Sequence, residues 1–162
     1  MIKIFNFGSK SQVEDRSFIS RLCDEKSFFK YFIPDLKRAK KEVIIESPFI
    51  TRQRMKTLTP IFKTLVNRGV SIYIFTRDPK EHQKPYDWQS EMEIQNFENI
   101  GVHTLICKGN HHRKLAIIDR EILWEGSLNI LSQTKSREIM RRIDSKFLAQ
   151  EMFDFLKLGK SI

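Results

Sequence analysis

The chain has 162 residues, a length that suits one domain with its own core. It carries 29 Lys and Arg against 20 Asp and Glu, for a formal net charge of +9, and 40% of its residues are hydrophobic. This composition excludes a disordered chain or a fibre, and no apolar run approaches the roughly 18 residues that span a membrane. Two Cys without a CxxC pair argue against a disulfide scaffold and a Cys-based zinc site, and the N-terminus lacks a signal-peptide pattern. We therefore expect a soluble cytoplasmic domain, and its positive charge indicates a polyanionic partner.

Hydrophobic periodicity predicts helices that alternate with strands. Residues 26–41 follow a helical pattern that contains Pro34, and a short apolar strand follows at 43–45. Two starts fit the next helix, because its apolar face begins near residue 51 whereas Thr59-Pro60 makes a good helix N-terminus. The later pattern predicts a strand at 70–75, a loop at 77–87, a helix at 90–100, strands at 102–107, 114–118 and 122–124, and a helix at 145–157. The alternation predicts an α/β fold, with a mixed, largely parallel sheet and helices on both faces.

The most specific pattern in the sequence is H-x-K, four residues, D, six residues, then G-S-x-N. Its fixed residues are His112, Lys114, Asp119, Gly126, Ser127 and Asn129. Residues two apart in an extended segment point to the same face, so His112 and Lys114 are expected to project together. An imidazole can attack phosphorus or protonate a leaving oxygen, and an ammonium group can neutralise phosphate oxygens. The backbone at Gly126-Ser127 and the polar side chains of Ser127 and Asn129 can bind the same anion.

This pattern resembles the HKD motif of the phospholipase D superfamily, and every fixed residue stands at the family spacing. The resemblance covers roughly residues 40–157 and includes Glu46-Ser47-Pro48-Phe49. It implies an α/β sandwich, phosphodiester chemistry through a phosphohistidine intermediate, and no required metal or cofactor. We expect residues 41–162 to form the catalytic domain and residues 1–40 to form an N-terminal helical extension.

Active members of that family usually combine two motifs, whereas this chain has one complete copy. His82-Gln83-Lys84 has the bare H-x-K letters, but Gln89 stands where the Asp belongs, so we interpret it as a coincidence in a loop. The resemblance to short bacterial endonucleases therefore implies a homodimer. By that analogy, His112 of one subunit attacks phosphorus, and His112 of the other protonates the leaving oxygen and then activates water.

The resemblance also implies roles for two acidic residues. In the family, the motif Asp tends to support the structure and does not touch substrate, and we assign that role to Asp119. A downstream acid orients the nucleophilic His through its other ring nitrogen, and Glu138 is the candidate. The alternative for Glu138 is an ordinary surface acid that pairs with Arg141 or Arg142. His111 is expected to flank the site and not to act in it.

Three hypotheses for the substrate remain open. The first is a metal-independent, non-specific nuclease that hydrolyses DNA or RNA, favoured by the single motif and by basic clusters at 37–41, 52–56 and 135–142. From these clusters, the phosphate-binding candidates are Arg52, Arg54, Lys135 and Arg137, although any one cluster alone is more often a solvated face. The second is a phospholipid hydrolase or transferase that faces anionic lipid. The third is a catalytically silent nucleic-acid-binding module, against which the intact motif counts.

Overall fold

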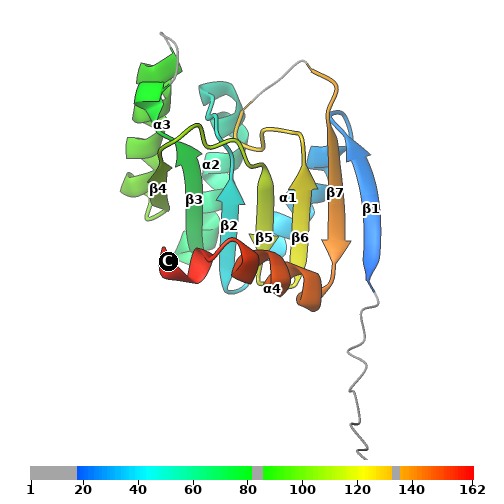
Figure 1. The fold of residues 1–162 in the computed structure, drawn as a ribbon. Coiled ribbons are helices and arrows are strands. Elements are labelled where there is room, and N and C mark those ends of the chain that lie inside the picture. Colours follow the sequence, from blue (N-terminus) through cyan, green and yellow to red (C-terminus); the bar gives the residue numbers. More distant parts are fainter. Residues whose placement is uncertain (1–17, 82–85, 133–135) are drawn as a thin grey trace, which may run out of the picture.

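The protein folds around one seven-stranded mixed sheet, seen face-on in Figure 1. A computed structural model describes residues 18–81, 86–132 and 136–162. The strands are Ile19–Asp24 (β1), Glu42–Glu46 (β2), Ser71–Arg77 (β3), His103–Cys107 (β4), Leu115–Ile118 (β5), Ile122–Gly126 (β6) and Ile139–Asp144 (β7). Their order across the sheet is β1-β7-β6-β5-β2-β3-β4, which places β5 in the centre.

Among the described strands, parallel pairing is confined to β2, β3 and β4. Helices connect these three strands along the chain, which allows them to run in the same direction. The strand β6 is antiparallel to both of its neighbours, β5 and β7, because the chain turns back after β5 and again after β6 without a crossover helix in the described part. β5 is also antiparallel to β2, and β1 to β7. The expected mixed α/β sheet is confirmed, with a smaller parallel share than the sequence predicted.

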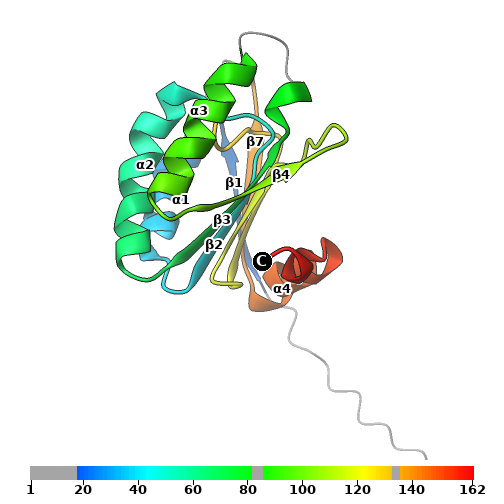
Figure 2. The same cartoon turned by 90° about the vertical axis from the view of Figure 1, so that its left-hand side faces the viewer.

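Helices cover both faces of the sheet, as the sequence predicted. They are Phe28–Arg38 (α1), Arg52–Asn67 (α2), Tyr86–Asn99 (α3) and Lys146–Phe155 (α4), with short 3₁₀ turns at Pro79–Glu81 (η1) and Leu158–Lys160 (η2). Figure 2 shows α1, α2 and α3 on one face and α4 alone on the other. Of the two starts considered for α2, the earlier one is correct, and Pro60 lies inside the helix. Met55, Leu58, Phe62 and Leu65 are all buried, so one continuous apolar face outweighs the helix-breaking tendency of that proline.

Two strands, β1 and β7, were absent from the sequence prediction. Within β1 only Cys23 is buried, so the strand has no hydrophobic face that periodicity could reveal. The following helix α1 packs Phe28 and Phe32 edge-on against Trp124 of β6, with ring centroids 5.1 and 5.8 Å apart. The described part of the expected N-terminal extension, residues 18–40, therefore adds a strand as well as a helix to the common sheet and core.

A buried ion pair joins α1 to the β6–β7 side of the sheet. The carboxylate of Asp35 accepts hydrogen bonds from Arg142 Nε at 2.6 Å, from Arg38 at 2.6 Å and from Trp124 Nε1 at 3.1 Å. Its ionic partners and its hydrogen bonds offset the cost of burying the charge. Arg142, part of the basic cluster at 135–142, is thus committed to the fold.

No helix in the described ranges is both long and apolar enough to cross a membrane. The cytoplasmic location stays a prediction.

Candidate active site

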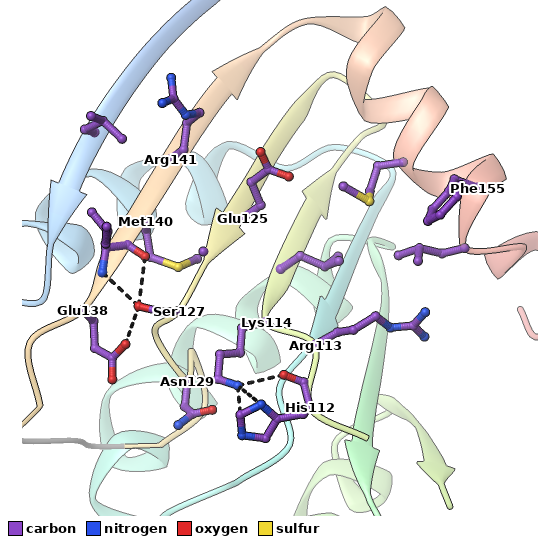
Figure 3. A pocket seen from close by; sticks show the side chains of 16 residues that line it. His112, Arg113, Lys114, Glu125, Ser127, Asn129, Glu138, Met140, Arg141 and Phe155 are labelled. Atoms are coloured by element: carbon purple, nitrogen blue, oxygen red, sulfur yellow. Dashed lines mark hydrogen bonds between the residues drawn. The ribbon is translucent and has the colours of Figure 1, made fainter. Parts of the chain in front are cut away.

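An open groove of about 1100 Å³ lies at one edge of the sheet, on the side of α4 (Figure 3). It lies where strand β2 ends and its neighbour β5 begins, since Glu46 at the end of β2 pairs with Leu115 at the start of β5. The groove is lined by five residues of the sequence pattern and by its downstream acid: His112, Lys114, Gly126, Ser127, Asn129 and Glu138. They come from the segment before β5, from the end of β6 and from the loop before β7, so the sheet order brings them together.

His112 and Lys114 are in direct contact, as their spacing predicted. Lys114 Nζ lies 2.9 Å from His112 Nδ1 and 3.3 Å from Nε2, and it donates a hydrogen bond to the His112 carbonyl at 2.7 Å. The His112 ring is exposed to solvent in the groove. Partial burial lowers the pKa of Lys114, while the nearby carboxylate of Glu138 acts in the opposite direction. An exposed imidazole beside a cation is a suitable arrangement for attack on a phosphate.

Glu138 is bound to hydroxyl groups at the other side of the groove. Ser127 Oγ donates a hydrogen bond to Glu138 Oε2, and Ser136 Oγ donates one to Oε1 at 2.5 Å. These two bonds, helped by the charge of Lys114, hold the pKa of Glu138 below its ordinary value, so the group is a carboxylate at neutral pH. The expected contact of Glu138 with a His112 ring nitrogen is replaced by the contact with Ser127, and Lys114 occupies the place beside Nδ1.

Gly126 brings the end of β6 against the backbone of β7. A Cβ atom at this position would lie 2.1 Å from the carbonyl oxygen of Ile139, which no side chain could accommodate. The close approach lets the backbone N–H of Ser127 donate to the Ile139 carbonyl at 2.9 Å, and lets the Ile139 N–H donate to Ser127 Oγ at 3.0 Å. Next to them, Asn129 Oδ1 is buried and has no hydrogen-bond partner among the described residues. Asn129 thus has unused hydrogen-bonding capacity inside the groove.

Residues 32–157 match the family model of the cardiolipin synthase, PLD-like domain. The chain belongs to the phospholipase D superfamily. Its enzymes are of the phosphodiesterase type, so the arrangement of His112 and Lys114 stands in a fold that hosts phosphodiester chemistry. A comparison with curated proteins found no match.

Solved structures show the same fold at low sequence identity. NucT from Helicobacter pylori is 19% identical with a TM-score of 0.66, over 87% of this chain and 94% of that one. The phospholipase D family member Nuc from Salmonella typhimurium is 17% identical with a TM-score of 0.70, over 87% and 93%. A phosphatidylserine synthase from Haemophilus influenzae is 15% identical with a TM-score of 0.65, over 88% and 38%.

Asp119 lies at the far end of β5 from the phospholipase D-type groove. Its carboxylate accepts hydrogen bonds from the backbone N–H groups of Lys40, Lys41 and Glu42, at 2.9, 2.7 and 3.0 Å. It therefore anchors the chain that enters β2 and does not line the groove, which agrees with the structural role implied by the family resemblance. Because β2 and β5 are antiparallel, the basic cluster at 37–41 also lies at this far end and does not flank His112 as expected.

The predicted phosphate-binding arginines have different surroundings. Arg52 at the start of α2 and Arg137 beside Glu138 are exposed. Arg54 is half-buried, and its guanidinium lies 3.6 Å from the ring centroid of Phe29, so it packs on α1. Burial lowers the pKa of Arg54. Lys135 and His82 lie outside the described residues.

The groove contains residues that the sequence analysis did not assign to it. Arg113, Glu125 and Arg141 line its polar part. The alternation of side chains along β6 places Glu125 on the same side as Ser127, a signal that was available once β6 had been predicted. Arg141 had no such signal, because β7 was not recognised as a strand.

The groove continues into an apolar part beside α4. Its lining there is Met152, Phe155 and Leu156 at the end of α4, whereas Ile139 of β7 lies beside Ser127; Leu22 of β1 also lines the groove. Phe155 is 80% exposed, and Leu22 and Ile139 are exposed as well. We refer to Met152, Phe155 and Leu156 as the apolar end of the groove. Exposed apolar side chains that line a groove are candidates for a binding surface.

No cluster of three or more His, Cys, Asp or Glu side chains suited to a metal ion occurs within residues 18–81, 86–132 and 136–162. The absence of a metal requirement stays a prediction.

Proposed function

We propose that this protein is a metal-independent phosphodiesterase that hydrolyses nucleic acid at a site shared by two copies of the chain. The contact between Lys114 Nζ and the exposed imidazole of His112 carries the proposal. It places a nucleophile beside a cation in an open groove that can admit a polymer. Exposed Arg52 and Arg137 are the described candidates for contacts to flanking phosphates.

In the proposed reaction, the His112 imidazole attacks phosphorus, forming a P–N bond while the P–O bond to the leaving group breaks. The leaving oxygen takes a proton from His112 of the partner subunit. That second imidazole then removes a proton from water, which attacks phosphorus, breaks the P–N bond and restores the first His112. Lys114 and Asn129 stabilise the charge on the non-bridging oxygens in both steps.

The second copy is proposed to cover the apolar end of the groove. This surface is continuous with the site, so a partner seated on it would bring its own His112 to the same region. Phe155 provides the largest exposed apolar side chain there. Covering it would remove apolar area from water at about 25 cal/mol per Å².

A phospholipid substrate is the second candidate, and the apolar end of the groove favours it. An acyl chain could lie along Met152 and Phe155 while the phosphodiester contacts His112. The matching family model, described by a cardiolipin synthase, fits this possibility. The two hypotheses assign different occupants to the same surface.

The deciding experiment is a cleavage assay in excess EDTA. Labelled single- and double-stranded DNA and RNA are incubated with the protein, in parallel with vesicles of anionic phospholipid. The proposal predicts cleavage of nucleic acid that survives chelation. Loss of all cleavage in EDTA would refute the metal-free mechanism, and head-group release without nuclease activity would select the lipid hypothesis. Binding of nucleic acid without cleavage of any substrate would indicate the silent binding module.

Dimerisation has a separate test in Phe155→Asp. A carboxylate in the covered surface would cost several kcal/mol of association energy, so light scattering should show a monomer, and nuclease activity should fall with it. Met92→Asp, at an apolar residue on α3 that is 43% exposed, is the control and should remain a dimer. A wild-type monomer that is fully active at the same concentration would contradict the shared site.

A further inference from the structure

We infer that Glu46 is a positioning residue for His112: it holds the side chain of Arg113 away from the His112–Lys114 pair and thereby directs His112 and Lys114 toward each other in the groove. The inference rests on the proposed function in its catalytic consequence. Neither the family pattern in the sequence nor the groove lining assigns Glu46 a role.

Glu46 has little freedom to move. It is the last residue of β2, where it pairs with Phe75 of β3 on one side and Leu115 of β5 on the other. Its side chain is completely buried. The carboxylate is therefore fixed by the centre of the sheet.

Two side chains of the segment 111–114 lie beside this carboxylate. Arg113 Nε is 2.5 Å from Glu46 Oε2, and His111 Nε2 is 3.6 Å from the same oxygen. His111 is 6% exposed, and Arg113 is 47% exposed. The segment thus alternates: 111 and 113 face Glu46, whereas 112 and 114 meet each other in the groove. Figure 3 shows Arg113 pointing away from the His112–Lys114 pair.

The segment needs such an anchor because it precedes the strand. The β2–β5 ladder ends at the pair Glu46–Leu115, and residues 111–114 are not in a strand or helix. Side-chain contacts to Glu46 continue the attachment to β2 beyond the last ladder pair. A rotation of the backbone at 113 would move His112 and Lys114 out of register together, because their side chains alternate with that of Arg113.

The charge of Arg113 favours the ionised form of Glu46. Burial raises the pKa of Glu46, and the Arg113 guanidinium opposes this shift. The second oxygen, Oε1, has no hydrogen-bond partner among the described residues. Arg113 is accordingly the main compensation for the buried charge, and the pair should resist separation while both groups are charged. Removing the charge of Glu46 frees a half-exposed arginine that can turn into solvent.

The test compares Glu46→Gln with Asp35→Asn. Both variants neutralise a buried carboxylate that is paired with arginine, but Asp35 contacts Arg142 outside the groove. Activity is measured on labelled oligonucleotide and on bis(4-nitrophenyl) phosphate, under conditions where each variant is folded. A misplacement of about 1 Å can cost on the order of 100-fold in rate, so we expect kcat of Glu46→Gln to fall roughly 10- to 100-fold with KM changed less than about threefold. Asp35→Asn should lose stability and keep kcat within about twofold.

A substrate-free measurement separates this inference from the proposed function. The ¹H–¹³C NMR signals of the His112 ring report whether the imidazole holds one orientation. Wild type and Asp35→Asn should give one sharp set, and Glu46→Gln should give broadened or averaged signals. If wild type cleaves no phosphodiester, the proposed function fails, while these spectra still decide whether Glu46 positions His112.

Arg113→Lys is the second variant, for the case in which Glu46→Gln does not fold. Lysine retains a cation for Glu46 but lacks the planar guanidinium, so kcat should be intermediate between wild type and Glu46→Gln. The inference would be overturned if Glu46→Gln and Arg113→Lys both gave His112 signals as sharp as those of the wild type and both had an unchanged kcat. A loss of kcat in Asp35→Asn equal to that in Glu46→Gln would overturn it as well, since the effect would then follow stability alone.

Discussion

The two ends of strand β5 carry residues of one sequence pattern and differ in almost every physical respect. Before β5, His112 is exposed and Lys114 touches its ring in an open groove. After β5, Asp119 is turned toward the backbone of residues 40–42 and uses its oxygens to bind three N–H groups. Residues that are close in a motif can thus have separate roles, because the strand between them places them at its opposite ends. Mutation of His112 or Lys114 should impair activity with little loss of stability. Mutation of Asp119 should lower stability and leave activity unchanged.

The largest expected effect is the loss of activity in His112→Ala. In a shared site, this change removes both the nucleophile and the general acid, so phosphodiesterase activity should fall at least about 1000-fold. The side chain is exposed, and its removal should change the free energy of unfolding by less than about 0.5 kcal/mol. Cleavage assays and urea denaturation of the same preparation measure the two quantities. Cleavage that persists would remove His112 from its proposed role.

At the other end of β5, Asp119→Ala should mainly lower stability. Three backbone N–H groups lose a charged acceptor, which we expect to cost about 2–4 kcal/mol, with kcat of the folded protein unchanged within about twofold. Asp119 also has a left-handed backbone with φ = 54°, a conformation that Asn tolerates better than Ala. Asp119→Asn should therefore be less destabilised than Asp119→Ala. Equal urea midpoints for wild type and Asp119→Ala would contradict the anchoring role.

A smaller effect concerns His111, which precedes β5 and should make the stability of the protein depend on pH. Burial, together with the charges of Arg113, Lys114 and His112, lowers the pKa of His111 from 6.5 to about 4 in the folded protein. The unfolded chain therefore takes up a proton first, and the stability that neutral His111 contributes is complete above pH 6.5 and is lost as the pH falls toward about 4. The loss at pH 4.5 is about 2–3 kcal/mol.

Comparison with His111→Gln at each pH isolates this contribution. The neighbouring Glu46 has a raised pKa and acts in the opposite sense, but it is present in both proteins. The difference in unfolding free energy between wild type and His111→Gln should shift against wild type as the pH falls from 7.5 to 4.5. A constant difference would show that His111 titrates alike in the folded and unfolded chain.

Local sequence patterns predicted the elements whose buried residues repeat regularly. The apolar face of α2 and the short runs of β2, β3 and β5 were all visible in this way, as was the contact of His112 with Lys114. The groove residues Ser127, Asn129 and Glu138 were named from the motif and its family resemblance, and the sheet order brings them to one place.

The parts that could not be predicted depend on contacts between distant residues. In β7, Arg142 faces the core side of the sheet because Asp35, 107 residues earlier in the chain, neutralises it there. A partly buried arginine breaks the expected alternation of apolar and polar residues, so the segment was interpreted as a basic surface cluster. The pairing of Glu46 with Arg113 spans 67 residues and is equally invisible to local patterns.

The pairing of β1 with β7 has a consequence for the order of folding. Ile19 is opposite Asp144, so the first described strand can acquire its neighbour only after the chain has been synthesised as far as β7. β2 and β3, by contrast, are close in sequence and can pair early. Long-range strand pairing is slow because a large loop must close before the contact is gained. On the ribosome, β1 should therefore wait as an unpaired strand until β7 emerges, and that interval is when the nascent chain is most prone to aggregation.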